Sequence, residues 1–139
     1  MIRAFLSFAG EDTQKVKKLI LLLHNPEYEL DFYDGPGDAD FDGEGAQVIK
    51  QAIGEKIVKC SITVCLISEN THNSKWVDAH LQKSRNKGNR IIAMALKGTV
   101  DAVLPAVVKE ENLTFYPWDP ARLKTLISQD TGKLFNNSL

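Results

Sequence analysis

The sequence predicts an α/β fold, in which a parallel sheet of about five strands lies between two layers of helices. Apolar runs of strand length alternate with segments whose apolar residues recur at helical spacing. The run Ile62–Ile67 is almost continuously apolar, as expected for a central strand that is covered on both faces. Because the connections between these segments are short, the alternation favours a flavodoxin-like three-layer sandwich with helices on both faces of the sheet.

The first half of the chain predicts two strands, two helices and one long loop. Arg3–Phe8 has the pattern of a short strand, and apolar residues from Val16 to Leu23 recur at helical spacing behind a start that is rich in acids. Tyr28–Tyr33 predicts the second strand. Residues 34–45 hold four glycines and a proline, which predicts a loop. The apolar stripe from Val48 to Ile57 predicts the next helix.

The second half continues the alternation with weaker signals toward its end. After the central strand Ile62–Ile67, the segment Lys75–Lys87 predicts a helix that a following glycine ends. Arg90–Leu96 predicts a buried strand. Leu113–Tyr116 is a candidate fifth strand, and Ala121–Ile127 is a candidate last helix.

Length and composition limit the class of protein. The chain has 139 residues, of which 43% are hydrophobic and 25% charged, so we predict one domain over residues 1–130 and a polar C-terminal tail over residues 131–139. No apolar run approaches the roughly 20 residues of a membrane span, and no signal peptide is evident, so we expect a cytoplasmic protein without a membrane partner. A net charge of -1 predicts no bulk attraction to nucleic acid. Cys60 and Cys65 lack zinc-site spacing, and no set of metal ligands emerges.

Ligands of parallel α/β sheets bind beyond the carboxyl ends of the strands, where three segments of this chain are expected to meet. They are Phe8-Ala9-Gly10, the loop 34–45 and the polar segment Ser68–Ser74. Small residues at the first turn allow a ligand to approach the backbone, and the following helix start presents free N–H groups. The alternative is a tight strand-to-helix turn without a ligand, since the turn lacks the pattern of a phosphate-binding loop.

The acidic loop admits two further interpretations that the sequence disfavours. Asp38–Gly43 matches the opening of an EF-hand calcium loop, but its twelfth position is Ile49 rather than glutamate, which favours a solvated loop. A receiver domain would need a phosphoacceptor aspartate at the end of the middle strand. That strand instead runs into Ser68-Glu69.

Trp76 and His80 are four residues apart on a predicted helix, which places both on the same side, one turn apart. Trp76 can form the wall of a pocket or simply cover the sheet. His80 can titrate near neutral pH, although a single histidine on a helix is often structural. Asp78 lies about 200° around the helix from its neighbours at 76 and 80 and is expected to point elsewhere.

Taken together, these segments resemble the TIR domain, and most closely the short bacterial TIR-like branch of Thoeris-type antiphage systems. Arg3–Asp12 is similar to the first sequence box of the family, and Phe32-Tyr33-Asp34 with the glycine-rich loop is similar to the second. Asn73–Val77, followed by Lys87–Ile92, resembles the helix and strand that come later in this branch. The resemblance spans residues 3–97, and its specificity comes from the order and spacing of the pieces.

The resemblance implies two activities. TIR domains assemble with other TIR domains, with adaptors or with an effector protein, so a homo-oligomer is one expected state. Many bacterial members cleave NAD+ between nicotinamide and ribose and release ADP-ribose-type messengers, so NAD+ is expected as substrate or ligand and no cofactor is implied. The catalytic glutamate of those enzymes, four positions after the tryptophan, corresponds to His80. The expected substrate-binding residues are Phe8, Ala9, Gly10, Asp34, Ser68 and Trp76.

Because this chain has His80 where those enzymes have glutamate, two hypotheses of different classes remain. Cleavage of the glycosidic bond develops positive charge on the ribose, which a carboxylate stabilises. A neutral imidazole offers one acceptor, and a protonated one repels the cation. The chain either still processes NAD+, with His80 or a loop acid such as Asp42 or Glu44 in that role, or it is a lapsed member that binds nucleotides or other TIR domains.

Overall fold

The computed structural model describes residues 1–33 and 40–137, with side chains through residue 129. Five parallel strands form a sheet in the order β2-β1-β3-β4-β5. The strands are β1 (Ile2–Ser7), β2 (Tyr28–Asp31), β3 (Ile62–Ile67), β4 (Arg90–Ala95) and β5 (Phe115–Tyr116). The predicted fold class is therefore confirmed, down to the number of strands and their parallel direction.

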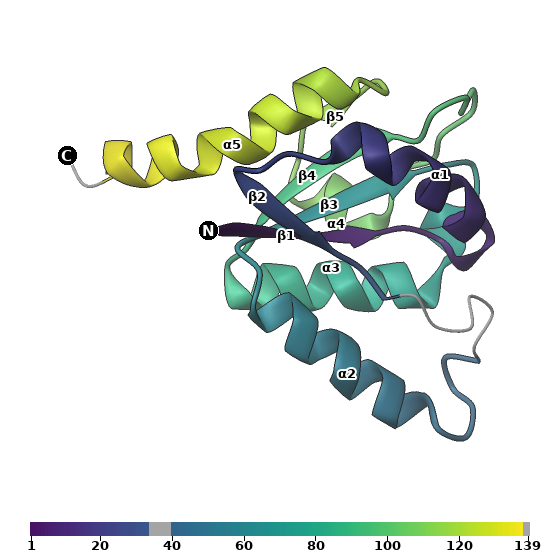
Figure 1. The fold of residues 1–139 in the computed structure, drawn as a ribbon. Coiled ribbons are helices and arrows are strands. Elements are labelled where there is room, and N and C mark those ends of the chain that lie inside the picture. The colour runs from purple at the N-terminus through teal and green to yellow at the C-terminus, as the bar shows by residue number, and fades with distance from the viewer. Residues whose placement is uncertain (34–39, 138–139) are drawn as a thin grey trace.

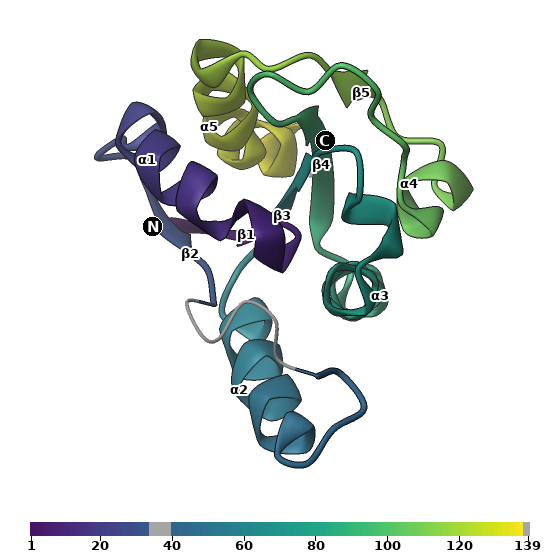
Figure 2. The ribbon, with the colours of Figure 1, turned by 90° about the vertical axis from the view of Figure 1, so that its right-hand side faces the viewer.

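Helices cover both faces of the sheet, as Figures 1 and 2 show. The helices are α1 (Thr13–Leu23), α2 (Ala46–Val58), α3 (Lys75–Lys87), α4 (Ala106–Glu110) and α5 (Pro120–Asn137). Two 3-10 turns precede α1 and α3, at Gly10–Asp12 and Thr71–Asn73. Helices α1 and α5 lie on one face, and α2, α3 and α4 lie on the other.

The alternation of side chains along β1 divides the core between the two faces. Ala4 and Leu6 pack with α1 and α5 in the largest apolar cluster, whereas Phe5 packs beneath α2 with Ile53 and Ile57. All six residues of β3 are buried, which agrees with its nearly continuous apolar sequence. Among the described residues, the cluster beneath α2 is the smallest of the three and holds four buried residues.

Four elements differ from their predicted extents. β2 ends at Asp31 rather than Tyr33, and β5 is shortened to two residues. The short helix α4 was not predicted, since five residues are too few to establish a helical period. Helix α5 continues through residues 131–137, past the predicted end at Ile127, because each further residue adds a backbone hydrogen bond at little cost. Val48, counted in the predicted stripe of α2, is 72% exposed.

The sheet order places a topological switch point between β1 and β3, since the chain proceeds outward from these strands in opposite directions. Beyond their carboxyl ends, the hydroxyl of Ser68 donates a hydrogen bond to Asp12 Oδ2 at 2.6 Å. The hydroxyl oxygen of Thr71 accepts a bond from the Ser68 backbone N–H at 2.7 Å. Side chains therefore join the two strand ends directly. Within the described residues, no helix has both the length and the apolar character needed to cross a membrane.

Candidate functional site

Helix α3 carries both residues of the predicted tryptophan–histidine pair and has defined ends. The Ser74 hydroxyl accepts a hydrogen bond of 3.2 Å from the Val77 backbone N–H, which caps the start of the helix. Gly88 ends it with a φ of 88°, a left-handed conformation that favours glycine. Trp76 therefore lies in the first turn and His80 one turn later, on the side that faces α2.

Replacing Ser74 with alanine is expected to lower the free energy of unfolding by about 1 kcal/mol, because one N–H of the first turn loses its acceptor. Chemical denaturation of the variant and the wild type measures this difference. Ser74→Asp is the matched control, since aspartate is also a good capping residue. Equal losses in the two variants would contradict a capping role for Ser74.

His80 is held inside the protein rather than at its surface. Its side chain is only 7% exposed, and its Nδ1 shares a hydrogen bond of 2.8 Å with Ser7 Oγ at the end of β1. The ring of Phe5 meets the imidazole edge-on, with 5.2 Å between the ring centroids. Within the described residues, Nε2 is buried without a hydrogen-bond partner. One nitrogen thus fixes the ring, and the hydrogen-bonding capacity of the other is unmet among the described residues.

Burial makes His80 uncharged at neutral pH. It lowers the pKa of the imidazole from its ordinary value of 6.5 to about 4, because the charged form loses its hydration inside the protein. The Ser7 hydroxyl cannot offset this loss, since it carries no charge. His80 therefore offers a neutral ring with one donor and one acceptor, and it supplies neither a negative nor a positive charge.

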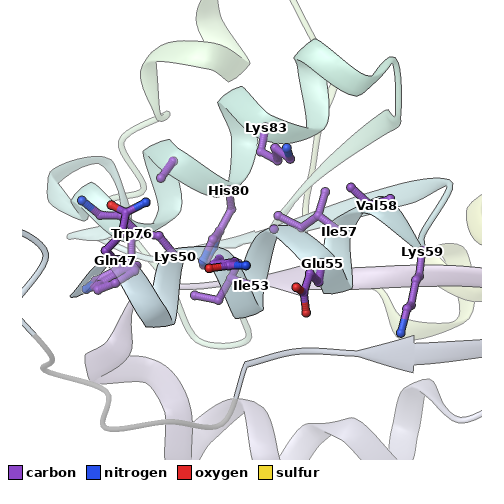
Figure 3. Close-up of a pocket in the computed structure, with 13 residues that line it drawn as sticks. Gln47, Lys50, Ile53, Glu55, Ile57, Val58, Lys59, Trp76, His80 and Lys83 are labelled. Atoms are coloured by element: carbon purple, nitrogen blue, oxygen red, sulfur yellow. The ribbon is translucent and has the colours of Figure 1, made fainter. Parts of the chain in front are cut away.

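A cavity of about 770 Å³ separates α2 from α3 and includes this pair of residues (Figure 3). The size lies within the usual range for small-molecule sites. Trp76, Ala79, His80 and Lys83 line it from α3. From α2 and the residue after it, the lining residues are Gln47, Lys50, Gln51, Ile53, Gly54, Glu55, Ile57, Val58 and Lys59. We call this cavity the α2–α3 groove.

The groove combines an apolar interior with a basic outer part. Ile53 and Ile57 are buried, and the two small residues Gly54 and Ala79 leave space between the helices. Three lysines against one glutamate give the lining two net positive charges, since His80 is neutral. The sequence analysis did not identify Ser7, Gly54 or the lysines of the groove. The packing of α3 on β1 brings Ser7 to His80, and the crossing of α2 and α3 brings Gly54 and the lysines into the groove. No local sequence pattern specifies either arrangement.

Aromatic and ionic contacts cover one end of the groove. The rings of Phe41 and Trp76 pack edge-to-face at a centroid distance of 5.0 Å, and Lys50 Nζ lies 3.8 Å from the centroid of Phe41. Next to them, Lys75 Nζ and Asp42 Oδ2 form an exposed ion pair at 2.7 Å. The hydrogen bond from Lys75 lowers the pKa of the Asp42 carboxyl. Trp76 thus lines the groove and also packs against the apolar cluster that includes Phe5.

The other predicted site residues lie outside this groove. Phe8 packs on the opposite face of the sheet, against Phe32 at a centroid distance of 6.0 Å. Ala9 is buried, and the Gly10 carbonyl accepts a hydrogen bond from the Thr13 hydroxyl at the start of α1. Ser68 is buried in its bonds to Asp12 and Thr71, as described above. Asp34 lies outside the described residues.

The acids that were considered as substitutes for the family glutamate do not line the groove. Asp42 is paired with Lys75, and Glu44 is exposed. Asp78 accepts a hydrogen bond from Gln82 at 2.8 Å and faces a neighbouring hollow, in agreement with its angular position on the helix. Glu55, which is exposed on α2, contributes the carboxylate found in the lining. In the part of the chain that the structure describes, no cluster of potential ligands could hold a metal ion.

Comparisons with known proteins agree on the fold. The TIR domains of the activated Roq1 resistosome recognizing the pathogen effector XopQ match with a TM-score of 0.59 and 16% identity, over 94% of this chain and 99% of that one. A CMP N-glycosidase of Clostridium botulinum, BcmB, matches with a TM-score of 0.53 and 16% identity, over 88% of this chain and 94% of that one. At such identities the likeness concerns the fold alone.

The comparison with curated proteins gives no match. A family model does match, over residues 5–101, and it describes the TIR-like domain of the Thoeris protein ThsB. The matched region includes the end of β1, strands β2 to β4, helix α3 and the whole α2–α3 groove. The chain therefore belongs to the family of the Thoeris protein ThsB TIR-like domain.

Proposed function

We propose that this chain is a signalling domain of a bacterial antiphage system, which acts in the cytoplasm and handles NAD+. In this proposal, NAD+ binds with its nicotinamide riboside end against Trp76 and His80, and the bond between nicotinamide and ribose is cleaved. The ADP-ribose-type product then acts on an effector protein, and other TIR domains, including further copies of this chain, are its assembly partners. The observation that carries the proposal is that His80, which the resemblance aligns with the catalytic glutamate, lines a groove of nucleotide size.

The main task of the protein in this reaction is to stabilise the positive charge that develops on the ribose. The bond from ribose C1′ to the nicotinamide nitrogen breaks, and its electron pair leaves with the nicotinamide. The resulting cation on the ribose is captured by water, which releases a proton to solvent. Nε2 of His80 would form a hydrogen bond to a ribose hydroxyl, and the indole of Trp76 would contact the nicotinamide ring. The BcmB fold neighbour, a CMP N-glycosidase by name, supports N-glycosidic cleavage as chemistry that this fold can host.

A second candidate function is a lapsed domain that binds nucleotides or other TIR domains without cleaving NAD+. The neutral state of His80 favours it, because no negative charge lies at the position where the ribose cation would form. The exposed carboxylate of Glu55 stands on the opposite helix.

Nicotinamide release from NAD+ by the purified protein tests the proposal. We expect slow release by the wild type, and a roughly tenfold decrease in His80→Phe, which keeps an aromatic ring but removes both nitrogens. His24→Gln is the control, since His24 is an exposed histidine outside the groove. The assay is repeated with extract of infected cells to supply a trigger. Binding of NAD+ without nicotinamide release under either condition would contradict cleavage and support the second candidate.

A further inference from the structure

Ser7 and His80 form a buried polar pair where the end of β1 meets α3. Both side chains are buried, and Ser7 Oγ lies 2.8 Å from His80 Nδ1. Among the described residues, the Ser7 side chain has no other hydrogen bond. On the far side of the ring, Nε2 is buried without a partner in the same part of the chain, and the His80 side chain extends from α3 into the lining of the α2–α3 groove (Figure 3).

The direction of this hydrogen bond decides which nitrogen of the neutral imidazole carries the proton. If Ser7 donates to Nδ1, the ring proton is on Nε2, and Nε2–H is the one group of the pair left without a partner. If Nδ1 donates to Ser7, both the hydroxyl proton and the lone pair of Nε2 are left without partners. Because each unmet buried polar group costs free energy, the first arrangement is the more stable.

The neighbours of the pair leave this count unchanged. Phe5 meets the imidazole edge-on and has no side-chain atom that donates or accepts a conventional hydrogen bond. Ser84, one turn further along α3, donates to the His80 carbonyl at 2.8 Å and shares a hydrogen bond of 2.6 Å with Thr63 Oγ1. The Ser84 hydroxyl therefore bonds the main chain of His80 and not its ring.

We propose that Ser7 is a positioning residue that fixes the proton of His80 on Nε2, so that the α2–α3 groove presents an N–H donor at position 80. A carboxylate at the same position could only accept hydrogen bonds. A ligand atom placed against His80 must therefore accept the bond, as a carbonyl or hydroxyl oxygen does. The inference rests on the proposed function only in placing a ligand in the groove, since the position of the proton is a property of the free protein.

Nitrogen NMR of the free protein with isotope-labelled histidines tests the proposal at neutral pH. The protonated and the unprotonated ring nitrogen have well-separated chemical shifts, so the spectrum reports the tautomer directly. We expect the Nε2–H form of wild-type His80 in roughly tenfold or greater excess over the Nδ1–H form. The chain has three histidines, and the double variant His24→Gln/His72→Gln assigns the His80 signals, because both replaced residues are exposed.

Three substitutions separate the action of Ser7 from a general loosening of the site. Ser7→Ala removes the donor to Nδ1, so the excess of the Nε2–H form should fall by about fivefold or more. Ser7→Thr retains a hydroxyl and should restore the wild-type excess. Ser84→Ala is the matched control, since it removes a buried serine hydroxyl that bonds the His80 carbonyl, and it should leave the tautomer unchanged.

The outcomes are independent of those of the NAD+ assay. A predominant Nδ1–H form in the wild type would overturn the inference, and this measurement needs no variant at position 7. An unchanged tautomer in Ser7→Ala, or an equal shift in Ser7→Ala and Ser84→Ala, would also overturn it. A fixed Nε2–H form without nicotinamide release supports the inference while the proposed cleavage fails. Nicotinamide release with a predominant Nδ1–H form gives the reverse result.

Discussion

Replacing His80 with glutamate is expected to raise the rate of nicotinamide release by about 10²-fold. A single well-placed electrostatic group contributes about 10²–10³ in rate, and the neutral imidazole of His80 supplies no charge. A carboxylate at this position would place two oxygens near the ribose, and the Ser7 hydroxyl that now bonds Nδ1 could donate to one of them. The rate is measured from nicotinamide formed under saturating NAD+.

The pH dependence of nicotinamide release by His80→Glu tests the same prediction. Burial disfavours a charged carboxyl as it disfavours a charged imidazole, so the gain should appear only as the pH rises far enough to ionise the new glutamate. His80→Gln is the control of similar size without charge, and it should show no gain. A higher rate of nicotinamide release in His80→Glu would show that position 80 is suited to a catalytic carboxylate. A loss would show that a carboxylate cannot take over the role of the imidazole in the reaction, contrary to this prediction.

Acidification is expected to cost the wild type about 3 kcal/mol of stability through His80 alone. The folded-state pKa of about 4 lies below the ordinary value of 6.5, so as the pH falls the unfolded chain takes up the proton first. The contribution is therefore fully present above pH 6.5, is lost between pH 6.5 and 4, and changes no further below that range. The measurement is the free energy of denaturant unfolding at a series of pH values.

The comparison with His80→Phe isolates this contribution from the carboxyl groups that titrate in the same range. Phenylalanine cannot take up a proton, so the stability difference between wild type and variant should change by about 3 kcal/mol across the interval. His24→Gln removes an exposed histidine and should leave the His80-dependent change in place. A difference between wild type and His80→Phe that stays constant with pH would show that the imidazole is not desolvated.

The sequence was informative about the fold because the strands are buried on both faces. β3 and β4 are nearly continuous apolar runs, and their extents agree with the prediction to within one residue. β5 and α4 are too short to carry a period of their own, and packing against the rest of the fold determines them. Val48 is exposed for a different reason, since it lies off the stripe of Ile49, Ile53 and Ile57 that faces the core.

The candidate site was predictable only where its residues share one helix. The spacing of Trp76 and His80 was sufficient to place them together, and both line the groove. Phe8 was expected near them, but alternation along β1 and beyond it places its ring on the opposite face of the sheet. The partner of His80 is Ser7, 73 positions earlier, and the groove lysines come from two helices. The first contact depends on how α3 packs on β1 and the second on how α2 and α3 cross, and a local pattern contains neither.

The hydrogen bond between Ser7 and His80 has an evolutionary consequence. A serine hydroxyl can donate to an imidazole nitrogen or to a carboxylate oxygen, so it accepts either residue at position 80. Replacing His80 with glutamate would therefore keep Ser7 as a hydrogen-bond partner without a second substitution in β1. The strand would not have to change for position 80 to alternate between these two residues.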